Sequence, residues 1–146
     1  EVTRWVLETV FSELKEARVD LSGMILKPNM IIDGKHARKA SVQEVAERTV
    51  NVLRATVPTA VPGIAFLSGG QSTEEATAHL SAMNAMGPLP WKLTFSYGRA
   101  LQASALKAWG GKSENVAAGQ RAFTHRAKMN GLAAIGGWDA ELEQAA

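Results

Sequence analysis

Two helix-start signals, each following a strand-like apolar segment, constrain the fold of this chain most strongly. Serine is followed three residues later by glutamate at positions 41–44 and again at 72–75, which is the spacing of a capping box. Apolar residues continue at the helical period behind the first box, so we expect helices that run to about residues 56 and 85. Strands and helices are therefore predicted to alternate along the chain.

Three apolar segments supply the expected strands, at residues 21–32, 61–68 and 91–96. The first is apolar enough for a parallel strand with both faces buried. Further helices are expected over about 100–109 and 113–134. This order is typical of right-handed βαβ units, so the predicted class is α/β with a parallel sheet.

An amphipathic helix is expected from the first residues. Val2, Val6, Val10 and Leu14 recur every four positions between charged side chains, and we interpret them as its apolar face. Three strands are few for a parallel sheet, and a closed (β/α)₈ barrel needs eight strands and about 250 residues. We therefore expect the chain to be the end of something larger.

Composition excludes several classes of protein. The 146 residues are 46% hydrophobic and 21% charged, which predicts a single globular unit over residues 1–146. No apolar run approaches the roughly 20 residues that cross a bilayer, and no signal-peptide pattern opens the chain, so we expect a cytoplasmic protein without a membrane partner. The net charge of +2, without a Lys/Arg run, argues against a nucleic-acid partner.

Metal and thiol chemistry have little support in the sequence. The chain has no cysteine, and its three histidines, His36, His79 and His125, lie far apart. We therefore expect no metal site. His79 and His125 are expected to be surface or internally hydrogen-bonded side chains. Arg121, Arg126 and Lys128 join His125 in a basic helical face that we expect to be solvated or to meet another subunit.

Lys27 is the most informative single residue, because it interrupts an apolar run. If the strand is buried on both faces, desolvation favours the neutral amine, which is a nucleophile that forms Schiff bases with carbonyl compounds. The alternative is a lysine at a strand end with its head in water, and Pro28 is compatible with that position.

Two glycine-bearing loops follow the second and third strands. Ser68-Gly69-Gly70 and Ser96-Tyr97-Gly98-Arg99 combine converging backbone N–H groups, a helix N-terminus and an arginine, which together suit a phosphate group. The alternative is a pair of tight turns with a surface arginine. In barrels, successive loops of this kind often build the phosphate site.

Three segments carry a family resemblance: LKPNM at 26–30, PGIAFLSGGQS at 62–72 and LTFSYGRALQAS at 93–104. In order and spacing they closely resemble class I fructose-bisphosphate aldolase, over essentially the whole chain. The resemblance implies a (β/α)₈ TIM barrel, of which this chain supplies about the last three strands and their helices. It also implies a cytoplasmic glycolytic enzyme that forms a homotetramer and requires no metal or other cofactor.

The resemblance assigns roles to seven residues. Lys27 would form the Schiff base with the ketone carbon of fructose bisphosphate or of dihydroxyacetone phosphate. The expected phosphate-binding residues are Ser68, Gly69, Gly70, Ser96, Gly98 and Arg99.

The family's proton-transfer carboxylates come from earlier strands, to which nothing in this chain corresponds. We therefore expect residues 1–146 alone to hold a half-site, with the nucleophile and phosphate cradle but without the acid/base groups. The alternative function is a non-catalytic phosphosugar-binding or assembly module of the same fold.

Overall fold

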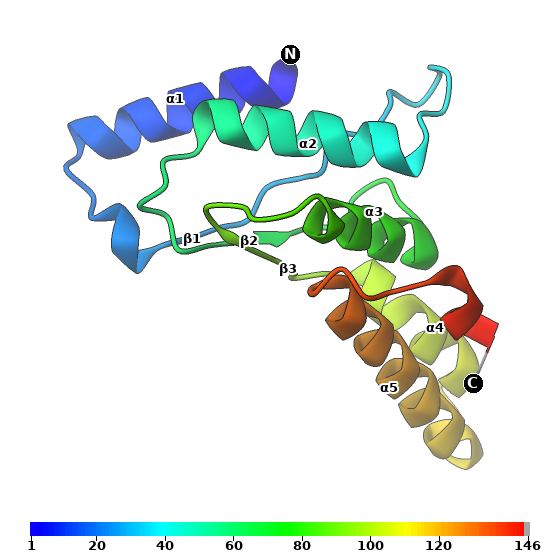
Figure 1. The fold of residues 1–146 in the computed structure, drawn as a ribbon. Helices are drawn as coiled ribbons and strands as arrows, with labels where there is room; N and C mark the ends of the chain where they lie inside the picture. Colours follow the sequence, from blue (N-terminus) through cyan, green and yellow to red (C-terminus); the bar gives the residue numbers. More distant parts are fainter. Residues whose placement is uncertain (145–146) are drawn as a thin grey trace.

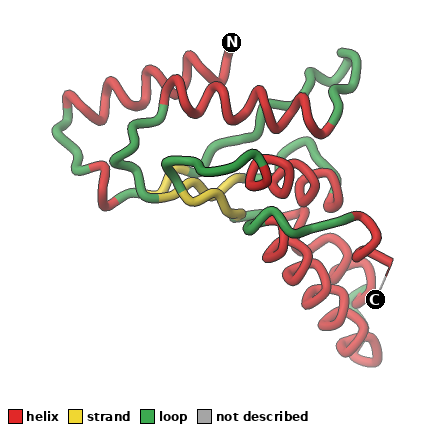
Figure 2. Tube along the Cα trace, in the orientation of Figure 1, coloured by secondary structure: helices red, strands yellow, loops and turns green. Residues whose placement is uncertain are grey.

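The computed structural model describes residues 1–144 and confirms the alternation of strands and helices (Figures 1 and 2). The elements, in chain order, are α1 (Val2–Glu16), η1 (Leu21–Gly23), β1 (Ile25–Leu26), α2 (Val42–Thr56), β2 (Gly63–Phe66), α3 (Thr73–Ala85), β3 (Lys92–Phe95), α4 (Arg99–Trp109), η2 (Ser113–Asn115), α5 (Val116–Ala133) and η3 (Ala140–Gln144). None of the described helices combines the length and apolar character that crossing a bilayer demands.

The three strands form one parallel sheet in the order β1-β2-β3. Ile25 pairs with Gly63 at the start of β1, and the β2–β3 ladder runs from the Gly63–Lys92 pair to the Phe66–Phe95 pair. The helices α2 and α3 are the crossovers between neighbouring strands, as parallel pairing requires. The predicted α/β class is confirmed.

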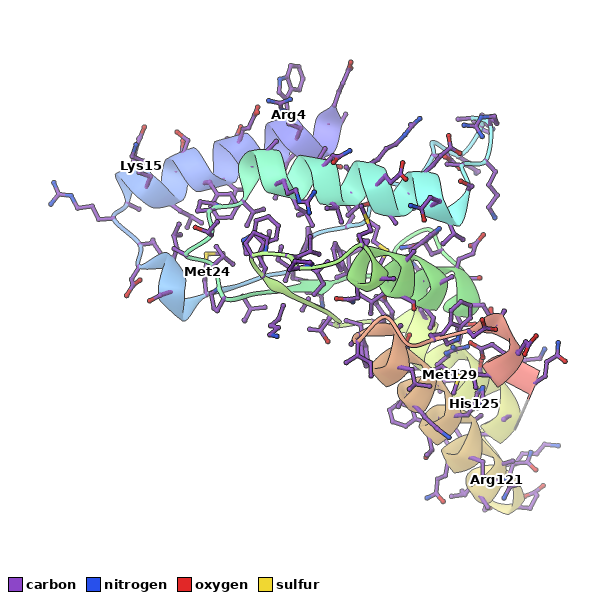
Figure 3. The ribbon with its side chains drawn as sticks, in the orientation of Figure 1. Arg4, Lys15, Met24, Arg121, His125 and Met129 are labelled. Atoms are coloured by element: carbon purple, nitrogen blue, oxygen red, sulfur yellow. The ribbon has the colours of Figure 1, made fainter. Side chains whose placement is uncertain are left out.

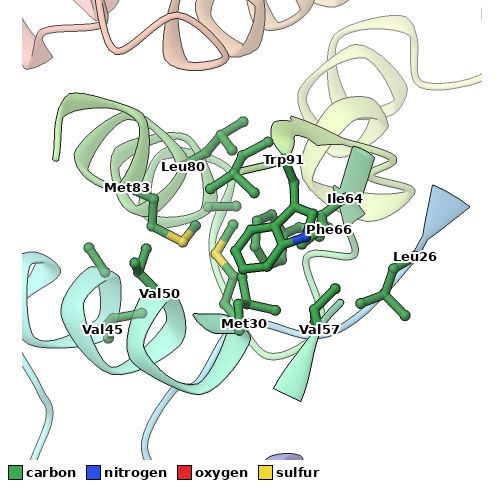
Figure 4. Close-up of a cluster of buried hydrophobic side chains, with 14 of the residues drawn as sticks. Leu26, Met30, Val45, Val50, Val57, Ile64, Phe66, Leu80, Met83 and Trp91 are labelled. Carbon is green, nitrogen blue, oxygen red and sulfur yellow. The ribbon is translucent and has the colours of Figure 1, made fainter. Parts of the chain in front are cut away.

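The described helices pack against one another: α1 contacts α2, α2 contacts α3, α3 contacts α4 and α5, and α4 contacts α5 (Figure 1). Helix α3 also contacts β3. Along the strands, side chains alternate between the side of the sheet that faces the helices and the opposite side. Leu26, Ile64 and Leu93 are buried on the helix side, with exposed fractions of 9%, 0% and 3%. Figure 4 shows this core, in which Met30, Val50, Phe66 and other apolar side chains meet between the sheet and α2 and α3.

The opposite side of the sheet is exposed, and we call it the open face. Ile25, Lys92 and Thr94 lie on it, and Ile25 is 62% exposed. Within residues 1–144, the first strand is buried on one face only, which differs from the expectation, and β1 itself spans only two residues. Its apolar run alternates in burial: Leu26, Pro28 and Met30 are buried, whereas Lys27 and Asn29 are exposed.

The capping boxes are formed as the sequence predicts. The Ser41 hydroxyl accepts from the Glu44 backbone N–H at 3.2 Å, and the Glu44 carboxylate accepts from the Ser41 N–H at 2.9 Å. Ser72 and Glu75 make the same two bonds, at 3.1 and 2.9 Å. These glutamates satisfy helix-start N–H groups, which is the structural role expected of them.

The apolar face of α1 differs from the expected one. Leu7 and Phe11 are its buried residues, whereas Val2 and Val6 are 72% and 54% exposed. Val2 and Val6 are four residues apart, and so are Leu7 and Phe11, so each pair forms an apolar stripe along the helix. Spacing alone cannot show which of the two stripes is buried. Contact with α2 decides which of the two is buried.

An ion pair between the buried Arg126 and the partly buried Glu143 anchors the C-terminal segment and corrects the expectation for Arg126. Figure 3 shows Arg121, His125 and Met129 along α5. Arg121 is exposed, but Arg126 is only 2% exposed. Its guanidinium donates to Glu143 from Nη1 at 3.1 Å and from Nη2 at 2.5 Å. The basic face is therefore interrupted where α5 packs against α3.

Three further bonds complete this latch between α3, α5 and η3. Trp138 Nε1 donates to Glu143 at 2.7 Å, and His125 Nε2 lies 3.1 Å from the same carboxylate. Arg126 also donates to Thr77 Oγ1 on α3 at 3.2 Å. Burial acts to raise the pKa of Glu143, but the bonds from Arg126, Trp138 and His125 outweigh it, so the pKa lies below its ordinary value.

We expect Glu143→Gln to lower the free energy of unfolding at pH 7 by about 2–3 kcal/mol, because Arg126 would stay buried without its counter-charge. The stabilisation comes from a carboxylate with a lowered pKa. It is thus complete above the unfolded value of 4.5 and is lost as the pH falls through the folded value. Urea unfolding at several pH values measures it.

The matched control is Glu141→Gln in the same segment, since the Glu141 side chain is exposed and takes no part in the latch. Equal stabilities of both variants at pH 7 would contradict the latch. A difference between wild type and Glu143→Gln that does not shrink in acid would contradict its electrostatic origin.

Candidate functional site

The expected site residues all lie at the carboxyl edge of the sheet. Lys27 directly follows β1, and the two glycine-bearing loops directly follow β2 and β3. The hydrogen-bond ladder continues past the strand ends, since Leu67 N–H donates to Pro28 O at 3.0 Å and Ser96 N–H donates to Phe66 O at 2.9 Å. In parallel α/β sheets this edge is where ligands bind.

Lys27 belongs to the open face. Along β1 the exposed Ile25 is followed by the buried Leu26, and the alternation brings Lys27 back to the side of Ile25. Lys27 is exposed and forms no ion pair with any carboxylate of residues 1–144. Of the two alternatives left by the sequence, the structure shows the lysine at a strand end. Its amine is accessible to a ligand on the open face.

The loop after β2 presents two exposed glycines. Gly70 has a φ of 78°, in the left-handed region that glycine adopts without a steric cost, and Gln71 N–H closes the turn onto Ser68 O at 3.2 Å. A Cβ at position 70 would lie 2.8 Å from the Ile32 Cδ1 atom. Ser68 itself is 8% exposed, so backbone groups dominate the accessible surface of this loop.

The loop after β3 leads into a helix start without a capping side chain. Gly98 is the N-cap of α4 and, having no side chain, leaves first-turn N–H groups available. Arg99 is exposed at the first helical position and forms no ion pair within the described chain. Together with Gln71 and Ser72 from the preceding loop, Arg99 lines a groove of about 270 Å³. Of the six expected phosphate-binding residues, Arg99 alone lines this groove, and Gly70 lines a different one beside His79.

Tyr97 lies between these residues and was missed by the sequence analysis. Its ring is 5% exposed and packs against Phe95 with centroids 5.5 Å apart, and its hydroxyl donates to Ala76 O on α3 at 2.9 Å. Burial raises the pKa of Tyr97 well above its ordinary value, so the phenol remains a donor. The apolar alternation of Leu93, Phe95 and Tyr97 was the available signal.

Two other polar groups stabilise the loops. His79 Nδ1 lies 2.6 Å from Gln71 Oε1, and burial lowers the pKa of His79. Of the two expectations for this histidine, the internally hydrogen-bonded one is confirmed. Lys39 pairs with Glu75, which joins the loop after β1 to the start of α3. Within residues 1–144, no cluster of three or more histidine or carboxylate side chains could hold a metal ion.

The arrangement suits a ligand with a carbonyl at one end and an anionic group at the other. Neighbouring strands are about 4.8 Å apart, so the backbones of β1 and β3 are separated by about 10 Å. A lysine amine extends from the first of these strands. Backbone N–H groups and a guanidinium follow the other two, and both kinds of donor favour phosphate.

Fold and site together define part of an α/β barrel protein with an amine and an anion cradle at its strand ends. The family model of the glycolytic class I fructose-bisphosphate aldolases matches residues 1–146. The chain therefore belongs to the class I fructose-bisphosphate aldolase family.

Individual relatives agree with this assignment. The chain is 57% identical to fructose-bisphosphate aldolase of Drosophila melanogaster over 93% of its own length and 38% of that protein. It is 58% identical to fructose-bisphosphate aldolase B of Sparus aurata, over 92% of its own length and 37% of that protein. The chain thus spans somewhat over a third of the curated relatives it matches.

A solved structure confirms the fold. Fructose-bisphosphate aldolase from Plasmodium falciparum, determined in complex with TRAP and a small-molecule inhibitor, superposes with a TM-score of 0.92 at 52% identity. The match covers 95% of this chain and 40% of that one. The expected fold, a portion of the TIM barrel family, is confirmed.

We expect Gly70→Ala to lower the free energy of unfolding by about 1–2 kcal/mol, because the new methyl group combines a left-handed backbone with a close approach to Ile32. Gly87→Ala controls for the backbone alone, since Gly87 has a φ of 97° and nothing within 4 Å of its Cβ position. Denaturant unfolding compares them. A smaller loss for Gly70→Ala than for Gly87→Ala would contradict the packing of this loop.

Proposed function

We propose that this chain supplies the carbonyl-binding lysine and the phosphate cradle of a fructose-bisphosphate aldolase. The enzyme would cleave fructose bisphosphate reversibly to dihydroxyacetone phosphate and glyceraldehyde 3-phosphate. The observation that carries this proposal is the convergence of Lys27 with both glycine-bearing loops at one edge of the parallel sheet.

Lys27 is proposed as the nucleophile. Its amine adds to the ketone carbon, and loss of water leaves a protonated Schiff base. When the adjacent carbon–carbon bond breaks, its electron pair moves toward the iminium nitrogen and forms an enamine. As the substrate's C4 hydroxyl gives its proton to a base beyond these residues, its oxygen becomes the aldehyde oxygen and glyceraldehyde 3-phosphate leaves. Protonation of the enamine carbon restores the iminium, and its hydrolysis releases dihydroxyacetone phosphate and the free amine of Lys27.

The loops orient the substrate in this proposal. Backbone N–H groups of Gly69, Gly70 and Gly98 and the guanidinium of Arg99 would bind a phosphate, with Ser68 and Ser96 beside them. Binding of this remote group holds the ketone within reach of Lys27, which converts an encounter in solution into a reaction within one complex.

The alternative, a non-catalytic phosphosugar-binding or assembly module, is supported by the composition of the open face. The residues on it from β1 to β3, Ile25, Lys27, Ala65, Lys92, Thr94 and Ser96, include no carboxylate. Proton transfer at the breaking bond therefore needs groups beyond these. Family membership favours the enzyme.

The wider properties that follow from the family are proposed with it. We propose a homotetrameric, cytoplasmic enzyme without a nucleic-acid or membrane partner, in which residues 1–146 form one structural unit. One relative is named a cytosolic aldolase, from Arabidopsis thaliana, at 55% identity over 92% of this chain.

Borohydride trapping tests the function. Incubation with dihydroxyacetone phosphate and borohydride is expected to give one reduced adduct, on Lys27, seen by intact mass and peptide mapping. Lys27→Met is expected to abolish it while changing the free energy of unfolding by no more than about 0.5 kcal/mol, because Lys27 is exposed.

Lys92→Met is the matched control, since Lys92 is the other lysine on the open face and should not affect trapping. Phosphate-free dihydroxyacetone should react more weakly. An adduct that survives Lys27→Met, or that forms equally well without the phosphate, would refute the proposed site.

A further inference from the structure

We infer that Tyr97 is a positioning residue that holds the two phosphate-binding loops in register with each other. This inference rests on the proposed function, since it concerns the same loops, but it assigns a role to a residue outside the seven named above. Tyr97 is the only tyrosine of the chain.

The hydroxyl of Tyr97 joins the loop after β3 to α3, the helix that follows the loop after β2. It donates to Ala76 O at 2.9 Å, across 21 positions of the chain. Ala76 lies in the first turns of α3, where its own N–H donates to Ser72 O, the N-cap that follows Gly69 and Gly70. A single bond thus connects the helix that starts after the first loop to the backbone inside the second.

The bond lies in the core and not in the site. Tyr97 is 5% and Ala76 is 0% exposed, so the hydroxyl does not face the anion. On either side of Tyr97, Ser96 and Gly98 are exposed. Because Tyr97 is fixed in the core, we expect it to set the direction of the backbone N–H groups on either side of it, at Ser96 and Gly98.

The ring and the hydroxyl make separable contributions. The ring packs against Phe95, which is part of β3 and would remain packed in Tyr97→Phe. The hydroxyl alone makes the bond to α3. Without it, Ala76 O loses its one donor outside α3 among residues 1–144, and the backbone bond from Ser96 N–H to Phe66 O is left to hold the start of the second loop.

The bond matters because phosphate needs donors from both loops at once. Preorganised N–H groups bind an anion without an ordering cost, and a relative displacement of even part of an ångström weakens several hydrogen bonds together. Loss of the Tyr97 bond should therefore reduce phosphate affinity more than it affects folding elsewhere.

The experiment is an inorganic phosphate titration of ¹⁵N-labelled residues 1–146, followed through the backbone amide signals of Gly69, Gly70 and Gly98. Tyr97→Phe is compared with wild type. We expect saturation at roughly three- to tenfold higher phosphate concentration in the variant, the effect of one lost hydrogen bond. The amide signals of the loop at 68–70 should also move before phosphate is added, although the substitution lies in the other loop.

Thr56→Val is the matched control. It also removes a hydroxyl donor to a backbone carbonyl, Val52 O at 2.8 Å, but within α2 and away from both loops. It should leave the titration unchanged. The urea unfolding midpoints of both variants show whether a loss of phosphate affinity merely accompanies a loss of overall stability.

Equal affinities of wild type and Tyr97→Phe, or unmoved signals at 68–70 in the free variant, would overturn the inference while leaving the proposed phosphate site intact. An equal loss in Thr56→Val would overturn it as well. If the wild type itself shows no phosphate response at the three glycines, both the cradle and its positioning by Tyr97 fail, whereas Lys27 trapping still tests the carbonyl site separately.

Discussion

The apolar layer between the sheet and helices α2 and α3 is the constraint on which the rest of the structure depends. Ile64 and Phe66 of β2 are 0% exposed in this layer, and burial of such a side chain contributes about 1.5–3 kcal/mol. Because β2 lies between the two other strands, anchoring it also places the ends of β1 and β3. The positions of Lys27 and of both loops follow from this layer.

The helices of residues 1–144 cover one side of the sheet, and this has a chemical consequence. Alternating side chains direct every second residue away from the helices, so Lys27 and Thr94 reach the open face while their neighbours build the core. A polar residue on this face requires no buried partner. The same backbone pattern that buries Leu26 therefore makes the next side chain available to a ligand.

Local signals account for what the sequence predicted well. Capping boxes at 41–44 and 72–75 involve bonds within four residues, so the local sequence alone locates the starts of α2 and α3. Glycine after a strand is likewise a local signal, and it pointed to both loops.

Features set by distant contacts were predicted poorly. Arg126 belongs to a helical stripe that resembles a solvated face, yet Glu143, 17 positions later, turns inward to meet it. Ile25 continues an apolar run but is exposed, because no helix of residues 1–144 covers that side of the sheet. Neither outcome follows from spacing, since each depends on which element packs against which.

Two polar clusters connect secondary-structure elements away from Lys27, and both involve α3. The Arg126–Glu143 latch ties η3 to α5 and α3, far along the chain from Lys27. The Tyr97 hydroxyl ties α3 to the loop after β3. Both clusters meet at α3, so this helix supports one phosphate loop directly and the other through a single bond.

The measurement that tests the central claim most directly is the crystal structure of the chain after borohydride reduction with dihydroxyacetone phosphate. The account predicts a secondary amine at Lys27 Nζ. The phosphate should lie against the backbone N–H groups of Gly69, Gly70 and Gly98, with the Arg99 guanidinium beside it. A secondary amine formed on another lysine, or a phosphate bound away from both loops, would contradict the claim that these strand ends form one site.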